Sequence, residues 1–171
     1  HSIWAHLQMA IPQLCNLGLS GMPFAGTDMG GFGSVTTGEL LGRWVQVGCF
    51  SPLFRNHSAM GSRQQEPWQF GQEILDIYRK YVKLRYRWIP YFYDLFRQAE
   101  QTGALVMRPL VYHYERDETA AVCNDEFLLG DRILVAPVVS QGVTRRLVYL
   151  PEGTWYDYWT DQRFTGPAWI V

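Results

Sequence analysis

The first hundred residues alternate between apolar positions at helical spacing and short, continuous apolar runs. Trp4, Leu7 and Ile11 lie three or four residues apart, which predicts the buried face of a helix. Ser2 is the predicted N-cap of this helix. Pro12 is expected to bend or interrupt it, because proline lacks the amide hydrogen that the helical ladder uses.

Two continuous apolar runs, residues 22–26 and 50–54, predict buried strands. A glycine-rich stretch follows the first run at residues 30–34, and a second helix follows that stretch. Thr36 is its predicted N-cap, with Glu39 reaching back in a capping box. These residues therefore predict a strand, a loop, a helix and a second strand in succession.

A long helix is predicted from about Gly71 to Gln101, with a kink at Pro90. Up to about residue 105 the elements thus run helix, strand, helix, strand, helix, which is typical of a parallel α/β fold. Only two parallel strands are predicted, whereas a closed eight-stranded barrel takes about 250 residues. Residues 1–105 are therefore expected to belong to a larger α/β domain.

Beyond residue 105 the pattern changes to short β-rich runs separated by turn signals, with a predicted turn at Pro151–Gly153. No helical spacing lies between these runs, so residues 106–171 are predicted to begin an antiparallel, all-β domain. The runs are residues 127–129, 132–139, 145–150 and 155–159.

The composition narrows the class of protein. The 171 residues are 47% hydrophobic and 18% charged with a net charge of -1, which excludes a disordered polyelectrolyte. Cys15, Cys49 and Cys123 are widely separated, which favours free thiols over disulfides or a zinc site and mildly favours a cytoplasmic location. The four histidines form no H-x-x-x-H pair, so no metal is expected, and no cofactor motif stands out. We expect no membrane partner, because no apolar stretch reaches about 20 residues.

Basic and aromatic residues are interleaved between residues 79 and 97, where six of the 15 basic residues lie. Such interleaving can bind nucleic acid. The apolar residues of this stretch nevertheless recur at helical spacing, which places the charges on the solvated flanks of an ordinary helix. No nucleic-acid partner is therefore expected.

Candidate chemistry lies where the two predicted parallel strands end. Asp28 follows the first strand, and Arg55 and His57 follow the second. The carboxyl ends of parallel strands carry functional sites, and these groups together accept from and donate to hydroxyls. Phe32, in the glycine-rich stretch, offers a flat face to a sugar ring. The alternative is a structural Asp28–Arg55 ion pair beside a satisfied histidine, and spacing alone leaves both interpretations open.

Two other motifs are weaker. Gly31-Phe32-Gly33 begins a G-x-G pattern, but Thr36 stands where the last glycine of a dinucleotide fingerprint belongs, and the P-loop lysine is absent. Glu66 offers a possible catalytic carboxylate. Because Pro67 follows it, a loop-anchoring role is favoured.

Several segments, taken in order, resemble glycoside hydrolase family 31, the α-glucosidase and α-xylosidase family. The stretch from Gly26 to Phe32, G-T-D-M-G-G-F, carries the clearest signal. The resemblance runs essentially from end to end. The other matching segments are residues 1–4, 21–24, 52–57, 65–68, 108–110, 127–131, 135–138 and 150–157.

The resemblance implies the C-terminal portion of a (β/α)8 TIM barrel followed by the start of a β-sandwich. It also implies hydrolysis of α-linked glucosides or xylosides with retention, which uses two carboxyl groups about 5–5.5 Å apart. In the family the nucleophile lies well upstream, and the acid/base lies in a motif just before the equivalent of His1. Since the sequence begins at His1 and not at Met, we expect both to be missing and the isolated chain to be inactive.

The resemblance also assigns roles to the strand-end residues. Asp28 matches a carboxylate of the sugar site, Phe32 an aromatic residue that faces the sugar, His57 a histidine that bonds a sugar hydroxyl, and Arg55 the arginine two residues earlier. The expected partner is an α-linked oligosaccharide. A non-catalytic carbohydrate-binding or interaction module remains the alternative, favoured by the 15% aromatic content.

Overall fold

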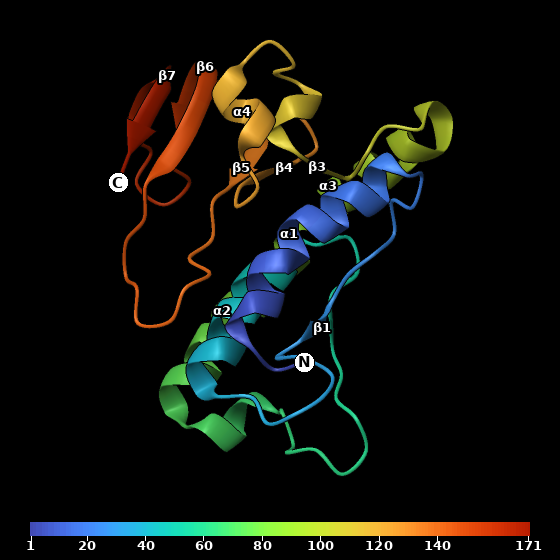
Figure 1. Cartoon of the computed structure of the whole chain (residues 1–171), viewed down its shortest axis with the longest axis vertical. Coiled ribbons are helices and arrows are strands. Elements are labelled where there is room, and N and C mark those ends of the chain that lie inside the picture. Colours follow the sequence, from blue (N-terminus) through green and yellow to red (C-terminus); the bar gives the residue numbers. More distant parts are fainter.

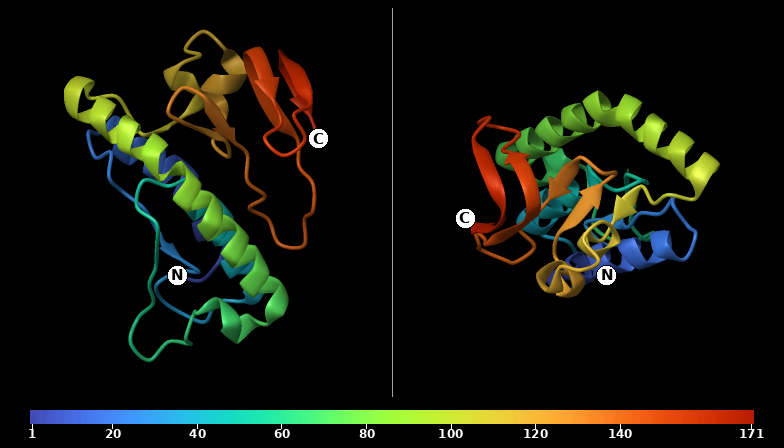
Figure 2. Two further views of the ribbon diagram at one scale, coloured as in Figure 1. Left: turned by 180° about the vertical axis from the view of Figure 1, so that it is seen from behind. Right: turned by 90° about the horizontal axis from the view of Figure 1, so that it is seen from above.

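The computed structural model describes all residues from 1 to 171 and has a helical part and a β part (Figure 1). In the helical part, α1 and α3 lie on opposite sides of the molecule, with α2 and the two strands between them (Figure 2). The elements in order are α1 (Trp4–Leu19), β1 (Asp28–Met29), α2 (Gly38–Gly48), β2 (Arg55–Asn56), a 3-10 turn (Pro67–Phe70) and α3 (Gln72–Thr102).

The β part contains two separate sheets. Strands β3, β4 and β5 form one antiparallel sheet in that order, and β6 and β7 form an antiparallel hairpin. The elements are β3 (Met107–Arg108), a 3-10 turn (Leu110–Tyr112), α4 (Glu118–Val122), β4 (Phe127–Leu129), β5 (Ile133–Val135), β6 (Val148–Tyr156) and β7 (Arg163–Ile170). The antiparallel arrangement agrees with the sequence pattern.

One apolar core runs through both parts. Leu7 of α1 and Trp44 of α2 belong to the same buried cluster as Met107, Phe127 and Val135 from the β part. Apolar surface removed from water at this junction stabilises the contact between the two parts. The strand ends of the helical part are therefore carried on a scaffold that includes the β part.

Both predicted helix caps are wrong. The Ser2 hydroxyl donates instead to the carbonyl of Gly33 at 3.0 Å, and α1 begins after Ile3 without a side-chain cap. In α2 the N-cap is Thr37, whose Oγ1 accepts from the Leu40 amide at 3.3 Å. Glu39 does not reach back, because its carboxylate accepts from the Gly142 amide at 2.7 Å. Distant partners outcompete the local capping contacts at both sites.

The two predicted strands are also misplaced. Residues 22–26 and 50–54 are irregular, and the parallel pairing begins only afterwards, with Asp28 opposite Arg55. Phe24 is 63% exposed, so the first run is not a buried strand. One backbone hydrogen bond, from the Leu53 amide to the Ala25 carbonyl at 3.0 Å, joins the two runs. The apolar runs therefore predicted a longer parallel strand pair than the two residues per strand that the structure has.

Proline has smaller effects than expected. Helix α1 continues through Pro12, and α3 continues through Pro90 as a single arched helix (Figure 2). Pro151–Gly153 is not a turn: it lies inside β6, where the register with β7 shifts between Leu150 and Gly153. The bulge absorbs the proline without ending the strand. The sequence pattern missed β7 and placed a separate strand at residues 155–159, where β6 ends.

Candidate functional site

Asp28 and Arg55 form the centre of the candidate site. They are register partners in the β1–β2 pair, so their side chains leave neighbouring parallel strands at the same end. Both Nε and Nη2 of Arg55 lie 2.7 Å from Oδ1 of Asp28. The ion pair is partly open to solvent, with side-chain exposures of 53% for Arg55 and 19% for Asp28.

His57 and Phe32 complete the predicted set. Nδ1 of His57 lies 3.5 Å from the same Oδ1 of Asp28. The Phe32 ring packs against the imidazole with ring centroids 5.1 Å apart. The structure therefore brings all four predicted residues together. None of these contacts uses Oδ2 of Asp28, which is left to accept a hydrogen bond from a ligand hydroxyl.

A cavity of about 220 Å³ opens beside this cluster. Asp28, Phe32 and Arg55 line it, together with His1 and His6 near the start of the chain. His57 is not in the lining but touches two residues that are. Phe32 is 47% exposed. A charged pair with unused hydrogen-bonding capacity beside an exposed aromatic ring is an arrangement that suits a polyhydroxylated ring.

The glycine-rich stretch is folded so that backbone, not side chain, meets its neighbours. Gly31 has a φ of 89°, and a Cβ there would come within 2.5 Å of the Ser2 amide nitrogen. That amide donates to the Gly33 carbonyl at 2.8 Å. Only glycine combines this backbone angle with so close an approach. The glycine-rich stretch therefore packs closely against the start of the chain through its backbone, and its Phe32 ring lies against His57.

Glu66 lies in a different cavity. This larger space, about 480 Å³, is lined by Asn56, Glu66, Trp68 and residues of α3. The Glu66 carbonyl accepts from the Gln69 amide at 2.9 Å in the 3-10 turn. Its carboxylate oxygen Oε2 is buried without a partner. Glu66 does not line the cavity of Asp28, so it is not part of the candidate site.

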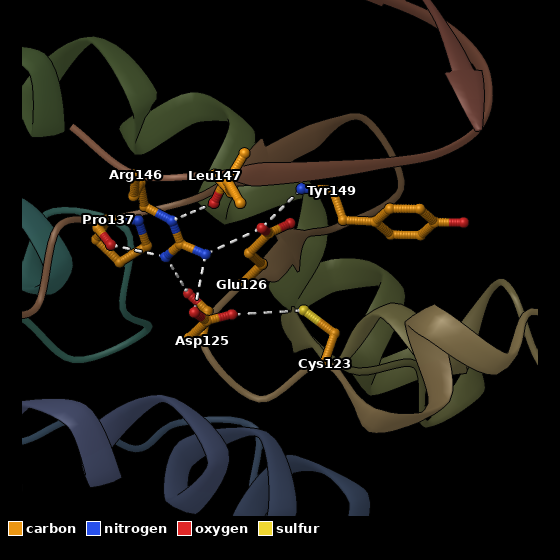
Figure 3. Close-up of polar contacts among 7 residues, drawn as sticks. All are labelled: Cys123, Asp125, Glu126, Pro137, Arg146, Leu147 and Tyr149. Carbon is orange, nitrogen blue, oxygen red and sulfur yellow. Dashed lines mark hydrogen bonds and ion pairs between the residues drawn. The ribbon is translucent and has the colours of Figure 1, made fainter. Parts of the chain in front are cut away.

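An acidic cluster in the β part was not anticipated from the sequence. Cys123, Asp125 and Glu126 place ligand-type atoms within 4.8 Å of one another. Figure 3 shows the Arg146 guanidinium between the two carboxylates, 2.9 Å from Oδ2 of Asp125 and 3.0 Å from Oε1 of Glu126. A cation is already supplied by the protein, so this set does not fit a metal ion.

The cluster has a perturbed acid at its centre. Glu126 is 1% exposed, and burial raises the pKa of its carboxyl to about 7. Arg146 and the Tyr149 amide, 2.9 Å away, both donate to Oε1 and oppose this shift. Oε2 has no partner, and we attribute the raised pKa to that uncompensated buried oxygen.

Two of the interleaved basic residues of α3, Lys80 and Arg85, contact other segments of the chain. Arg85 donates to the carbonyls of Cys49 and Pro52 at 3.0 and 2.8 Å, just after α2 ends. The Lys80 ammonium lies 4.2 Å from the centre of the Trp159 ring. Arg85 and Lys80 thus tie α3 to the segment that follows α2 and to the loop after β6.

Known protein families match both parts of the chain. The family model described as glycosyl hydrolases family 31 TIM-barrel domain matches residues 1–95. The family 31 C-terminal domain model matches residues 103–171. The chain belongs to glycosyl hydrolase family 31. Its fold is a TIM-barrel part followed by a β domain, and a self-standing sugar-binding module is not what these matches describe.

Relatives in family 31 are similar over almost the whole chain. Alpha-glucosidase 2 of Bacillus thermoamyloliquefaciens is 53% identical over 96% of the chain. A solved family 31 dextranase of Flavobacterium johnsoniae, complexed with glucose, is 38% identical with a TM-score of 0.92 over 98% of the chain. A family 31 α-xylosidase from a soil metagenome, complexed with xylose, is 34% identical with a TM-score of 0.91 over 99%. The chain spans 21%, 21% and 29% of these proteins, respectively.

No helix is both long and apolar enough to cross a membrane.

Among the thiols, Cys15 and Cys49 are buried, and burial raises the pKa of each to about 12. Cys123 is partly buried. None of the three thiols has the lowered pKa of a nucleophilic cysteine.

Sequence reasoning missed two residues that hold the site together. Ser2, expected to be a helix cap, anchors the glycine-rich stretch, and Gln65 does the same from the opposite direction with a hydrogen bond of 3.0 Å to the Gly31 carbonyl. Gln65 lies in one of the segments that resembles the family, and that was its only sequence signal. Contacts over 31 and 34 positions leave no local pattern.

Proposed function

We propose that this chain forms one side of the sugar pocket of a retaining α-glucosidase. The enzyme would hydrolyse terminal α-linked glucosyl, or xylosyl, residues of oligosaccharides. The observation that carries the proposal is that Arg55 and His57 both contact Oδ1 of Asp28. This arrangement leaves Oδ2 of Asp28 for a sugar hydroxyl. The relatives named as an α-glucosidase, a dextranase and an α-xylosidase support this substrate class.

In the proposed mechanism these residues bind and orient the sugar but do not cleave the bond. Asp28 and Arg55 would hold ring hydroxyls, while Phe32 would cover an apolar face of the ring. Fixed placement of the ring lowers the entropic part of the barrel enzyme's activation barrier. We propose that the nucleophile and the acid/base, which retaining cleavage needs about 5–5.5 Å apart, lie outside residues 1–171.

Kinetics of the full-length enzyme with 4-nitrophenyl α-D-glucopyranoside test this proposal. His57→Ala is expected to lower kcat/KM more than tenfold, because a polar contact to the sugar is lost in a closed site. Arg132→Ala, at an 80% exposed side chain of the β part, is the control and is expected to keep wild-type kinetics. Wild-type kinetics of the His57→Ala enzyme would contradict the assignment of His57.

The proposal that the nucleophile and the acid/base lie outside residues 1–171 can be tested separately. Residues 1–171 expressed alone are expected to give no turnover of 4-nitrophenyl α-D-glucopyranoside or of the corresponding xyloside. Clear turnover that is inhibited by glucose would show that this chain contains its own acid and nucleophile. The same pair of substrates, given to the full-length enzyme, would distinguish glucosyl from xylosyl preference.

A further inference from the structure

The parallel strand pair alone does not fix the candidate site. Only two residues of each strand are paired, Asp28 with Arg55 and Met29 with Asn56. Phe32 and His57 both lie beyond the end of this ladder, yet their rings are in contact at 5.1 Å. Contacts outside the ladder must therefore set their relative position.

Those contacts come from residues 59–65. The Ala59 amide donates to the Phe32 carbonyl at 2.8 Å. Nε2 of Gln65 donates to the Gly31 carbonyl at 3.0 Å, and Nδ2 of Asn56 donates to the Gln65 carbonyl at 2.8 Å. Asn56 stands between Arg55 and His57. Gln65 therefore binds the glycine-rich stretch with its side chain and the second strand with its backbone.

The Gln65 side chain has one orientation open to it. The residue is 4% exposed, and its Oε1 lies over Gly30, where an added Cβ would be 2.0 Å away. Exchanging Oε1 and Nε2 would place an oxygen against the Gly31 carbonyl oxygen, which two acceptors cannot share. The amide is thus held in place as a donor to Gly31, and its Oε1 is buried without a partner.

We propose that Gln65 is a positioning residue of the sugar pocket, whose amide holds the Phe32 loop in register with the strand end that carries His57. This inference rests on the proposed function. Gln65 does not line the cavity beside Asp28; it acts through Gly31 and Asn56. Loss of its donor leaves the Gly31 carbonyl with only the longer contact from the Ser2 hydroxyl, at 3.4 Å. The Phe32 ring then loses its fixed place over the imidazole.

Gln65→Glu in the full-length enzyme tests this role, because the side chain keeps its size but loses the donor when ionised. At pH 8 the carboxylate faces the Gly31 carbonyl, and kcat/KM for 4-nitrophenyl α-D-glucopyranoside is expected to fall about tenfold to a hundredfold. Because the site is buried, the pKa of the introduced carboxyl should be raised, so that at pH 5 the acid is protonated and donates again. The ratio of variant to wild type is then expected to return to within about threefold. The lower kcat/KM at pH 8 should result from a higher KM more than from a lower kcat.

Gln64→Glu is the matched control, since it makes the same change at the neighbouring, exposed residue and should stay at the wild-type rate at both pH values. A Gln65→Glu enzyme with wild-type kinetics at pH 8 would overturn the proposal. A loss that is the same at both pH values would also overturn it, because a general structural defect does not depend on that proton. If Gln65→Glu fails to fold, Gln65→Met replaces it. Its kcat/KM is expected to fall by the same factor at both pH values, and unchanged kinetics would overturn the proposal.

Amide hydrogen exchange separates this inference from the proposed function. Exchange of residues 28–34 is expected to speed up in Gln65→Glu at pH 8 and not in Gln64→Glu, whatever the activity of the wild type. A wild type without glucosidase activity, combined with this faster exchange, would refute the function and keep the positioning role. An active wild type with unchanged exchange in Gln65→Glu would refute the positioning role alone.

Discussion

The Asp28–Arg55 pair of the helical part and Arg108 of the β part use their charges in opposite ways. In the helical part, Arg55 is 53% exposed and Asp28 keeps one carboxylate oxygen without a contact to the other site residues. In the β part, Arg108 is 3% exposed and donates to three acceptors. Buried charge with a full set of partners serves the fold, whereas exposed charge with unused capacity is available to a ligand.

The largest expected effect tests the β side of this contrast. Arg108 donates to the Leu105 carbonyl at 2.6 Å, to Oε1 of Gln98 at 2.8 Å and to Nε2 of His113 at 2.9 Å. Arg108→Ala leaves these acceptors unpaired, so urea denaturation should show a loss of about 4 kcal/mol in the free energy of unfolding.

Arg132→Ala is the control for that measurement. The Arg132 side chain is 80% exposed and 3.6 Å from Asp131, so the cost should stay below about 0.5 kcal/mol. Equal losses in the two variants would break the comparison between buried and exposed arginines.

The next largest effect concerns Glu126, which is expected to make the free energy of unfolding depend on pH. Its pKa is about 7 in the folded chain and near its ordinary value of 4.5 when unfolded. Between these values the folded state binds more protons, so stability is greatest below about pH 4.5 and falls as pH rises toward 7. The fall attributable to Glu126 is on the order of 2 kcal/mol.

Glu126→Gln should remove this fall. Urea denaturation at pH 5, 6 and 7.5 gives the difference between variant and wild type, in which the opposite contribution of His113 cancels. The pKa of His113 is lowered by burial and by Arg108, so its contribution is lost as pH falls. A difference that does not change with pH would mean that Glu126 is ionised throughout, with Arg146 fully compensating its charge.

The sequence predicted the helices well, but helix caps, strand bounds and distant contacts poorly. The long helix was expected at residues 71–101 and lies at Gln72–Thr102, because its apolar spacing persists over many turns. The strands β1 and β2 are two residues long, which leaves no period to detect. Asp28, Arg55 and His57 were found because each follows an apolar run. Gln65 and Glu126 were not, since their partners lie 34 and 20 residues away.

The smallest expected effect on stability decides between the two interpretations of Asp28. An exposed ion pair contributes below about 1 kcal/mol, so Asp28→Asn should barely change urea denaturation. Asp76→Asn is the control, because the Asp76–Arg79 pair is also solvent-accessible and has a contact of 2.6 Å, but neither of its residues lines the cavity beside Asp28. Only Asp28→Asn is expected to weaken glucose inhibition of the full-length enzyme, by about tenfold or more. If Asp28→Asn instead lost about 2 kcal/mol of stability and kept its glucose affinity, the ion pair would serve the fold, and the contrast between the two parts would disappear.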